Sequence, residues 1–80
     1  MTQAILRLPA VKATTGLSRS TLYLRIAHEV FPHPVSLGGR AVGWPAHEIA
    51  ALNAARIAGK PDAEIRALVK QLEAARKAVA

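Results

Sequence analysis

The stretch TGLSRSTLY, residues 15–23, joins two short segments that both suit helices. Gly16 supplies the positive φ angle that a tight reversal after a helix requires. Ser18 suits the N-cap of the following helix, because its hydroxyl can accept a hydrogen bond from a free N–H group of the first turn. Upstream, Pro9 suits the first position of a helix that we expect over residues 9–14. The stretch therefore predicts the turn and the second helix of a helix-turn-helix.

The second helix of this motif has two unlike faces. Leu22 and Ile26 recur at four-residue spacing and predict a buried edge, with Leu17 anchoring the turn. Arg19 projects from the first turn, so the outward face is cationic at its amino end. At about 100° of rotation per residue, that outward face is formed by Ser20, Tyr23, Leu24 and Ala27. A narrow face of this kind suits entry into a groove, although two helices that simply pack together show the same local pattern.

The size and composition of the chain limit what it can do. Its 80 residues predict one small domain with a thin core and little room for an enclosed active site. Cysteine is absent, which removes disulfides and thiolate zinc sites and fits a reducing cytoplasm. There is no basic-then-apolar leader and no apolar run of roughly 18–20 residues, so we expect a cytoplasmic protein without a membrane partner.

The charge of the chain is strongly positive. The formal net charge is +6 and the pI is about 10.9, which favours a polyanionic partner, nucleic acid before membrane. Residues 1–45 hold five basic side chains against one acidic, whereas residues 46–80 hold six against four. The excess of positive charge therefore accompanies the predicted helix-turn-helix.

An extended segment is expected on each side of the two helices. In the lead-in, residues 1–8, the apolar side chains of Ile5, Leu6 and Leu8 suit a short extended segment against the core. After the second helix, the prolines of the sequence VFPHP, residues 30–34, forbid a helix and favour an extended path. Phe31, the only phenylalanine, is expected to fill the core where the chain leaves the second helix.

A β-hairpin is predicted next. Val35–Leu37 and Ala41–Trp44 suit two short strands, joined at Gly38-Gly39, a pair that favours a tight turn with positive φ. Trp44 is the natural anchor in the core, and Arg40 lies at or beside the hairpin tip. We therefore predict a mainly α fold with a small two-stranded β-hairpin, a winged helix-turn-helix followed by a C-terminal helix.

A third helix is expected from Pro45 to about Ala58, stopped by Gly59. Arg56 falls near its apolar side, so we expect the stem to follow the core and the head to reach water or a phosphate. The chain is then divided into a winged helix-turn-helix domain over residues 1–59 and a C-terminal amphipathic helix over residues 60–80.

The C-terminal helix begins near Pro61. Its predicted ion pairs, Asp62–Arg66 and Glu73–Lys77, have the favourable i,i+4 order. Its apolar stripe consists of Ile65, Leu68, Val69, Leu72 and Val79, interrupted by Arg76. The stripe suits either packing on its own domain or pairing of two copies. In a dimer, Arg76 would need a carboxylate such as Glu73 of the other copy.

The sequence offers no catalytic or metal-binding constellation. His47-Glu48 opens like the helix of a zinc protease, but Ala51 stands where the second histidine is required. No nucleophile has a base at helical spacing, and no glycine-rich phosphate loop is present. Glu29 and Glu48 each suit a surface carboxylate or the structural partner of an arginine. We therefore predict no enzyme, no metal, no cofactor and no small-molecule ligand.

The order of these features resembles the AlpA family of phage and prophage regulators, small winged helix-turn-helix proteins related to excisionases and to MerR-type DNA-binding domains. The matching residues are Gly16–Thr21, Tyr23, Phe31-Pro32, Leu37-Gly38, Arg40 and Val42–Trp44, within about residues 5–59. The resemblance implies a bacterial or phage-encoded protein that binds double-stranded DNA. It also implies that Arg19, Ser20 and Tyr23 face the DNA, and that Arg40 reaches the backbone or the minor groove.

One position departs from the family pattern. Relatives usually have a glycine at the end of the second helix, where this chain has Glu29. A glutamate there either takes left-handed geometry at some cost or lets the helix continue.

We predict from these observations a sequence-specific DNA-binding transcriptional regulator. Arg19 is expected to contact a base or a phosphate near the helix N-terminus. Ser20 and Leu24 would contact base edges, while Tyr23 and Arg25 would hold phosphates. Arg25 also lies toward the buried side, which leaves a structural role open. The full set of predicted DNA-binding residues is Lys12, Ser18, Arg19, Ser20, Tyr23, Leu24, Arg25 and Arg40.

Two other functions stay open at this point. One is an excisionase-like architectural factor that bends DNA. The other is a protein-interaction or packaging adaptor whose C-terminal helix carries the function. The copies of the protein would either form a homodimer or assemble along DNA.

Overall fold

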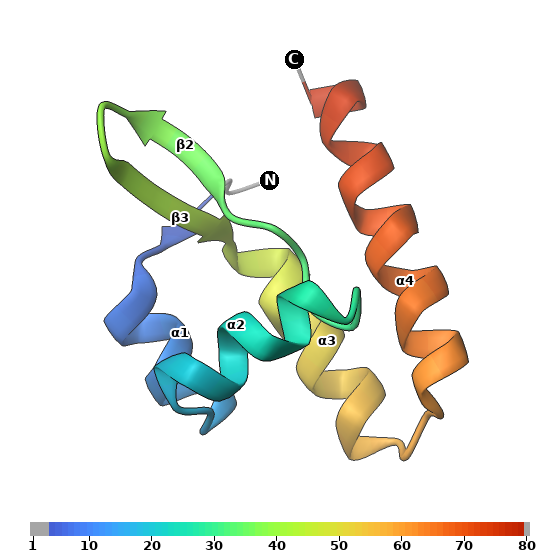
Figure 1. The fold of residues 1–80 in the computed structure, drawn as a ribbon. Helices are drawn as coiled ribbons and strands as arrows, with labels where there is room; N and C mark the ends of the chain where they lie inside the picture. Colours follow the sequence, from blue (N-terminus) through green and yellow to red (C-terminus); the bar gives the residue numbers. More distant parts are fainter. Residues whose placement is uncertain (1–3, 80) are drawn as a thin grey trace.

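The computed structural model describes residues 4–79, which form four α-helices, three short strands and a final 3-10 turn. In chain order these are β1 (Ile5–Leu6), α1 (Leu8–Thr15), α2 (Arg19–Ala27), β2 (Val35–Gly38), β3 (Ala41–Pro45), α3 (Ala46–Ile57), α4 (Asp62–Ala75) and η1 (Arg76–Val79). Figure 1 shows the β2–β3 hairpin projecting from the first three helices, with α4 running beside α3. This arrangement confirms the predicted class, a helical fold with a small hairpin and a C-terminal helix. None of the helices within residues 4–79 has the length and apolar character that crossing a membrane requires.

The predicted turn between α1 and α2 is present. Gly16 ends α1 with a φ of 74°, and its N–H donates to the carbonyl of Lys12 over 2.8 Å. Ser18 caps α2, because its Oγ accepts from the backbone N–H of Thr21 over 3.3 Å. Leu22 and Ile26, the predicted buried edge of α2, are 0% and 8% exposed. The local chemistry of this stretch therefore fixes the helix-turn-helix as expected.

The sheet has three strands rather than the predicted two. The lead-in forms β1 and pairs antiparallel with β3, Ile5 opposite Pro45 and Leu6 opposite Trp44, which gives the order β1-β3-β2. Gly43 of β3 permits this close approach, since a Cβ atom there would lie 2.5 Å from Cγ2 of Ile5. The extended lead-in was thus predicted, but its pairing was missed because no local pattern indicates a partner so distant in the sequence.

The hydrophobic core consists of two clusters. The first joins the helix-turn-helix to the hairpin and is formed by Val11, Leu22, Ile26, Phe31, Trp44 and Ile49. Within it the rings of Phe31 and Trp44 meet edge to face with centroids 6.3 Å apart, and Trp44 Nε1 donates to the carbonyl of Pro32 over 2.9 Å. Phe31 and Trp44 are therefore the core residues that the sequence predicted.

The second cluster attaches α4 to the rest of the chain. It is formed by Val30, Leu52, Ile65 and Val69, with Ala55, Leu68 and Leu72 packed against it. The apolar stripe of α4 therefore packs on its own domain, the first of the two alternatives. The side chain of Val79 lies outside the described residues. Pairing of two copies stays a prediction, but it would have to share or replace this contact.

The predicted ion pairs along α4 are wrong, because partners from other elements lie closer. Asp62 pairs with Arg56 of α3 over 3.2 Å, so the head of Arg56 contacts a carboxylate rather than only water. Arg66 instead donates from Nε to the carbonyl of His28 over 3.2 Å. Glu73 accepts from the backbone N–H and from Nδ1 of His33, over 2.7 and 3.0 Å. In the folded chain these contacts replace the i,i+4 pairs.

Arg76 also has a partner within the chain, whereas the dimer alternative required a carboxylate from another copy. Its Nε and Nη2 donate to the two carboxylate oxygens of Glu48 over 2.8 and 2.6 Å, and Nη2 donates to the carbonyl of His33 over 2.7 Å. Glu48 is completely buried at the start of α3. Of its two predicted roles, Glu48 therefore has that of a structural partner, and the ion pair joins α3 to the end of α4.

This network changes the titration of two groups. Burial acts to raise the pKa of Glu73, but the hydrogen bonds from His33 and the charges of His33 and Arg76 outweigh it and lower that pKa. The hydrogen bond to Glu48 raises the pKa of Arg76. Because the folded-state pKa of Glu73 is lowered, its contacts stabilise the fold above the unfolded pKa. That stabilisation is lost as the pH falls through the folded-state value.

Glu29 takes left-handed geometry, one of the two predicted outcomes. Its φ is 63°, and within residues 4–79 it is the only residue other than glycine with a positive φ. The N–H of Val30 donates to the carbonyl of Arg25, and that of Glu29 to the carbonyl of Ile26, both over 3.0 Å. These two hydrogen bonds form a Schellman motif, the ending in which glycine is usually found. The chain therefore leaves α2 sharply, at a cost in backbone strain.

Replacing Glu29 with glycine should stabilise the protein by about 0.5–1 kcal/mol, because the left-handed penalty of roughly 1–2 kcal/mol exceeds the added freedom of the unfolded chain. Urea unfolding followed by circular dichroism measures the change. Glu29→Gln is the matched control, since it removes the charge and retains the strained side chain. A glycine variant no more stable than the glutamine variant would show that the geometry of Glu29 is not strained.

Candidate nucleic-acid interface

The outward face of α2 is exposed along its whole length. Ser20 and Ala27 are exposed small residues, and Tyr23 and Leu24 retain 38% and 57% of their surface. The fold itself does not use these side chains, because the buried edge of α2 lies on the other side. The major groove of DNA admits an α-helix, and a helix face that is small, partly apolar and accessible from end to end suits such a groove.

The amino end of this face carries an ordered cation. The guanidinium carbon of Arg19 lies 5.4 Å from the ring centroid of Tyr23, within the range of a cation–π contact. Ser20 lies beside them, and the three residues line one shallow hollow. The structure thus brings together Arg19, Ser20 and Tyr23, the residues that the resemblance placed on DNA.

Ser18, which was predicted both as an N-cap and as a DNA-binding residue, has a structural role in the chain. Its Oγ accepts from the N–H of Thr21 and donates to Oγ1 of Thr21 over 3.0 Å. Both bonds stabilise the first turn of α2, so the hydroxyl group of Ser18 is used within the chain. A direct contact of Ser18 with DNA stays a prediction.

Lys12 and Arg40 are separate from the face of α2. Lys12 is exposed on α1, and Arg40 is exposed in the turn between β2 and β3. Figure 1 shows that this turn forms the far end of the hairpin. Within residues 4–79, neither Lys12 nor Arg40 forms an ion pair or a side-chain hydrogen bond, and Arg19 forms none either. Three cations of the predicted site are therefore available to an external anion.

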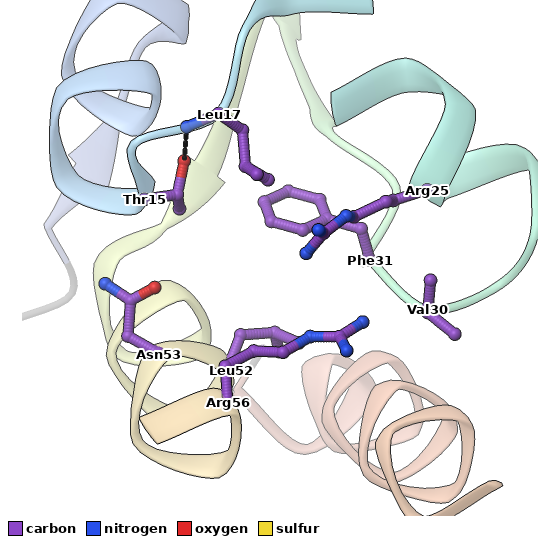
Figure 2. Close-up of a pocket in the computed structure, with 8 residues that line it drawn as sticks. All are labelled: Thr15, Leu17, Arg25, Val30, Phe31, Leu52, Asn53 and Arg56. Atoms are coloured by element: carbon purple, nitrogen blue, oxygen red, sulfur yellow. Dashed lines mark hydrogen bonds between the residues drawn. The ribbon is translucent and has the colours of Figure 1, made fainter. Parts of the chain in front are cut away.

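Arg25 lies on the other flank of α2, where it is half-buried. It lines a hollow of about 280 Å³ with Phe31, Leu52 and Arg56. Figure 2 shows the guanidinium groups of Arg25 and Arg56 extending from α2 and α3 on facing sides of this hollow. The aliphatic stem of Arg25 packs along the core, while its guanidinium group reaches the hollow. The structure therefore accommodates both roles predicted for Arg25, a structural one and a phosphate contact. The convergence of Arg25 with Arg56 was not predicted, because it depends on how α3 packs.

The chemistry of the candidate interface suits an anionic partner. Its functional groups are guanidinium and ammonium ions and hydroxyl groups, which are able to contact phosphates and base edges. Within residues 4–79, no three His, Asp or Glu side chains gather in a way that could hold a metal ion.

Comparison with known proteins gives two matches. The family described as prophage CP4-57 regulatory protein (AlpA) matches residues 4–57. The uncharacterized protein ORF88 of Enterobacteria phage P4 is 48% identical over 58 residues, which is 72% of this chain and 66%, just under two thirds, of the phage protein. No solved structure matches significantly. The family match includes α1, α2 and the hairpin, which carry the candidate interface, and excludes α4.

Proposed function

The chain belongs to the AlpA family of prophage regulatory proteins, and we propose that it is a sequence-specific DNA-binding transcriptional regulator. The observation that carries this proposal is the exposed face of α2, with Arg19 at its amino end. In the proposed complex α2 enters the major groove, as the second helix of a helix-turn-helix does. The hairpin tip with Arg40 then lies against the backbone or the minor groove.

Each predicted residue has a distinct task in this complex. Arg19 donates to guanine or to a phosphate, while Ser20 and Leu24 contact base edges, Leu24 most simply a thymine methyl group. Tyr23 holds a phosphate and keeps Arg19 in place through its ring. Lys12, Arg25 and Arg40 contact phosphates and fix the orientation of the protein without selecting the sequence.

The alternative of an adaptor that acts through α4 has less support. Ile65 and Val69 of the apolar stripe are buried in the second core cluster, so they are not available to a partner in this fold. The excisionase-like alternative shares the same DNA contacts and differs in the bend that it imposes on the duplex.

Replacing Arg19 with alanine should weaken binding to the preferred site by about 1–3 kcal/mol and relax the preference at one base pair, if the arginine donates to guanine. The measurement is fluorescence anisotropy with a duplex obtained by selection from random DNA and with a scrambled duplex. Arg40→Ala provides the contrast, because loss of a phosphate contact should weaken binding to both duplexes equally.

Three results decide the matter. If the wild-type protein binds neither duplex at low salt, the proposed function is wrong. Equal binding to both duplexes would reduce it to non-specific DNA binding. Unchanged affinity of Arg19→Ala for both duplexes would remove Arg19 from the site while leaving the regulator proposal to other residues of α2.

A further inference from the structure

A groove lined by three arginines runs between α2, α3 and the start of α4. Its first part is the hollow of about 280 Å³ in Figure 2, and its second part is an adjoining hollow of about 470 Å³. The two parts share Arg25, Val30 and Arg56, and Arg66 lines the second part. We call this feature the arginine groove and define it by Arg25, Arg56 and Arg66.

The arginine groove has more donors than the chain satisfies. Within residues 4–79, the side chain of Arg25 makes no hydrogen bond or ion pair, the side chain of Arg56 uses only Nη1, on Asp62, and that of Arg66 uses only Nε, on the carbonyl of His28. Asp62 is the only carboxylate among the lining residues. The groove therefore retains a positive charge and several guanidinium N–H groups that can bind an anion.

The floor of the groove strengthens this attraction. Val30, Phe31 and Leu52 lie beneath the arginines and are at most 5% exposed. Apolar walls lower the local dielectric constant, so a charge held above them interacts more strongly with an anion than it would in water. The floor has little accessible surface, so the site suits a compact oxyanion better than a large apolar ligand.

The position of the groove indicates where the anion comes from. At about 100° per residue, Arg19 and Tyr23 lie on one side of the exposed face of α2, and Arg25 lies beyond its other side, toward the buried edge, where it is half-buried. Leu24 belongs to that exposed face and also lines the second part of the groove. A helix seated in the major groove has a phosphate backbone on each flank, so in the proposed complex the head of Arg25 would reach toward the strand opposite to the one near Arg19.

We propose that the arginine groove binds a phosphate diester of the DNA backbone, on the flank of α2 away from Arg19. This inference rests on the proposed function and extends the contact surface to Arg66 of α4, beyond the family-matched residues 4–57. The planar forks of Arg25 and Arg66 suit phosphate oxygens, which they can hold through paired N–H groups. A cleft that closes on the backbone from three helices would fix the angle at which α2 enters the groove.

The test measures how DNA affinity depends on salt for Arg25→Gln and Arg66→Gln. Each variant should bind about tenfold more weakly to both the selected and the scrambled duplex, as expected for one charge-assisted contact. The log–log salt slope should flatten by about one unit. Lys77→Gln is the matched control for net charge, because Lys77 is exposed on η1 and makes no ion pair within residues 4–79. Arg25→Lys should keep the salt slope and lose only part of the affinity.

A second measurement separates DNA phosphate from a free anion. The melting temperature is followed in inorganic phosphate and in chloride at equal ionic strength, and circular dichroism confirms that each variant is folded. If phosphate stabilises the wild type but not Arg25→Gln, while both proteins bind DNA equally, the groove serves a free anion and the inference is overturned. Salt slopes equal to that of Lys77→Gln also overturn it, while the proposed function survives. Wild-type protein that binds no DNA removes both proposals.

Discussion

Replacing Arg76 with methionine should lower the free energy of unfolding by about 3–5 kcal/mol, because the change leaves the carboxylate of Glu48 buried without its charge partner. Both oxygens of Glu48 accept from Arg76, and Glu48 has no exposed surface. A domain of this size has a total stability of roughly 4–12 kcal/mol, so the variant should be close to unfolded. Thermal and urea unfolding followed by circular dichroism measure the loss.

A double-mutant cycle isolates the ion pair from the packing of the arginine stem. Adding Glu48→Gln to Arg76→Met removes the buried charge and should recover much of the lost stability, since a neutral amide costs less to bury. Lys77→Met is the control for the adjacent position, and it should change stability by no more than about 0.5 kcal/mol. If Arg76→Met lowers the free energy of unfolding no more than that control does, the contact behaves as an exposed ion pair. The prediction that the Glu48–Arg76 pair stabilises the fold is then wrong.

The ion pair connects the family-matched part of the chain to the part outside it. Glu48 lies in α3, within the match over residues 4–57, whereas Arg76 lies beyond α4. Leu52 of α3 is likewise covered by Ile65 and Val69 of α4. We therefore infer that α4 contributes to the stability of the winged helix-turn-helix, so that the predicted boundary at residue 59 does not separate two independent folding units.

Features encoded by a few neighbouring residues were predicted from the sequence. Gly16 and Ser18 indicate the α1–α2 turn because a left-handed C-cap and an N-cap are local chemistry. The Gly38-Gly39 pair indicates the hairpin for the same reason, since both residues take positive φ. The burial of Leu22 and Ile26 follows from helical periodicity. These local features are present in the folded chain because no distant contact competes with them.

Features that depend on packing were not predicted. Asp62–Arg66 was expected because an i,i+4 pair contributes about 0.3–0.5 kcal/mol, an amount small enough for any well-placed partner to outweigh. Arg56 takes Asp62 instead, across the turn between α3 and α4. Glu48 and Arg76 are 28 residues apart, so nothing in the sequence near either residue indicates the other.

The candidate site shows the same division. The exposure of Ser20, Tyr23 and Leu24 follows from the period of α2 and from the buried positions between them. The arginine groove instead depends on the placement of α3 and α4, which brings Arg56 and Arg66 to Arg25. The sequence indicated only the separate positions of Arg25, toward the buried side of α2, and of Arg56, beside the apolar side of α3.

Replacing Ile65 with alanine should lower the free energy of unfolding by about 2–5 kcal/mol, because it opens a cavity in the second core cluster. Ile65 is completely buried against Val30 and Leu52. Ile57→Ala is the matched control, since Ile57 is 86% exposed at the end of α3 and loses the same atoms. Its stability should change by no more than about 0.5 kcal/mol. Urea unfolding of both variants beside the wild type measures the difference.

The same experiment decides between the two roles of the apolar stripe when it is repeated at protein concentrations that differ about fiftyfold. A cluster formed within one chain gives an unfolding midpoint that does not depend on concentration, whereas a stripe that pairs two copies gives a midpoint that rises with it. Because Ile65 and Val69 already pack in one cluster with Leu52 of α3 and with Val30, which follows α2, we expect no concentration dependence. A rising midpoint that Ile65→Ala abolishes would instead assign the stripe to a dimer. The contact between α4 and α3 would then have to open before two copies could pair.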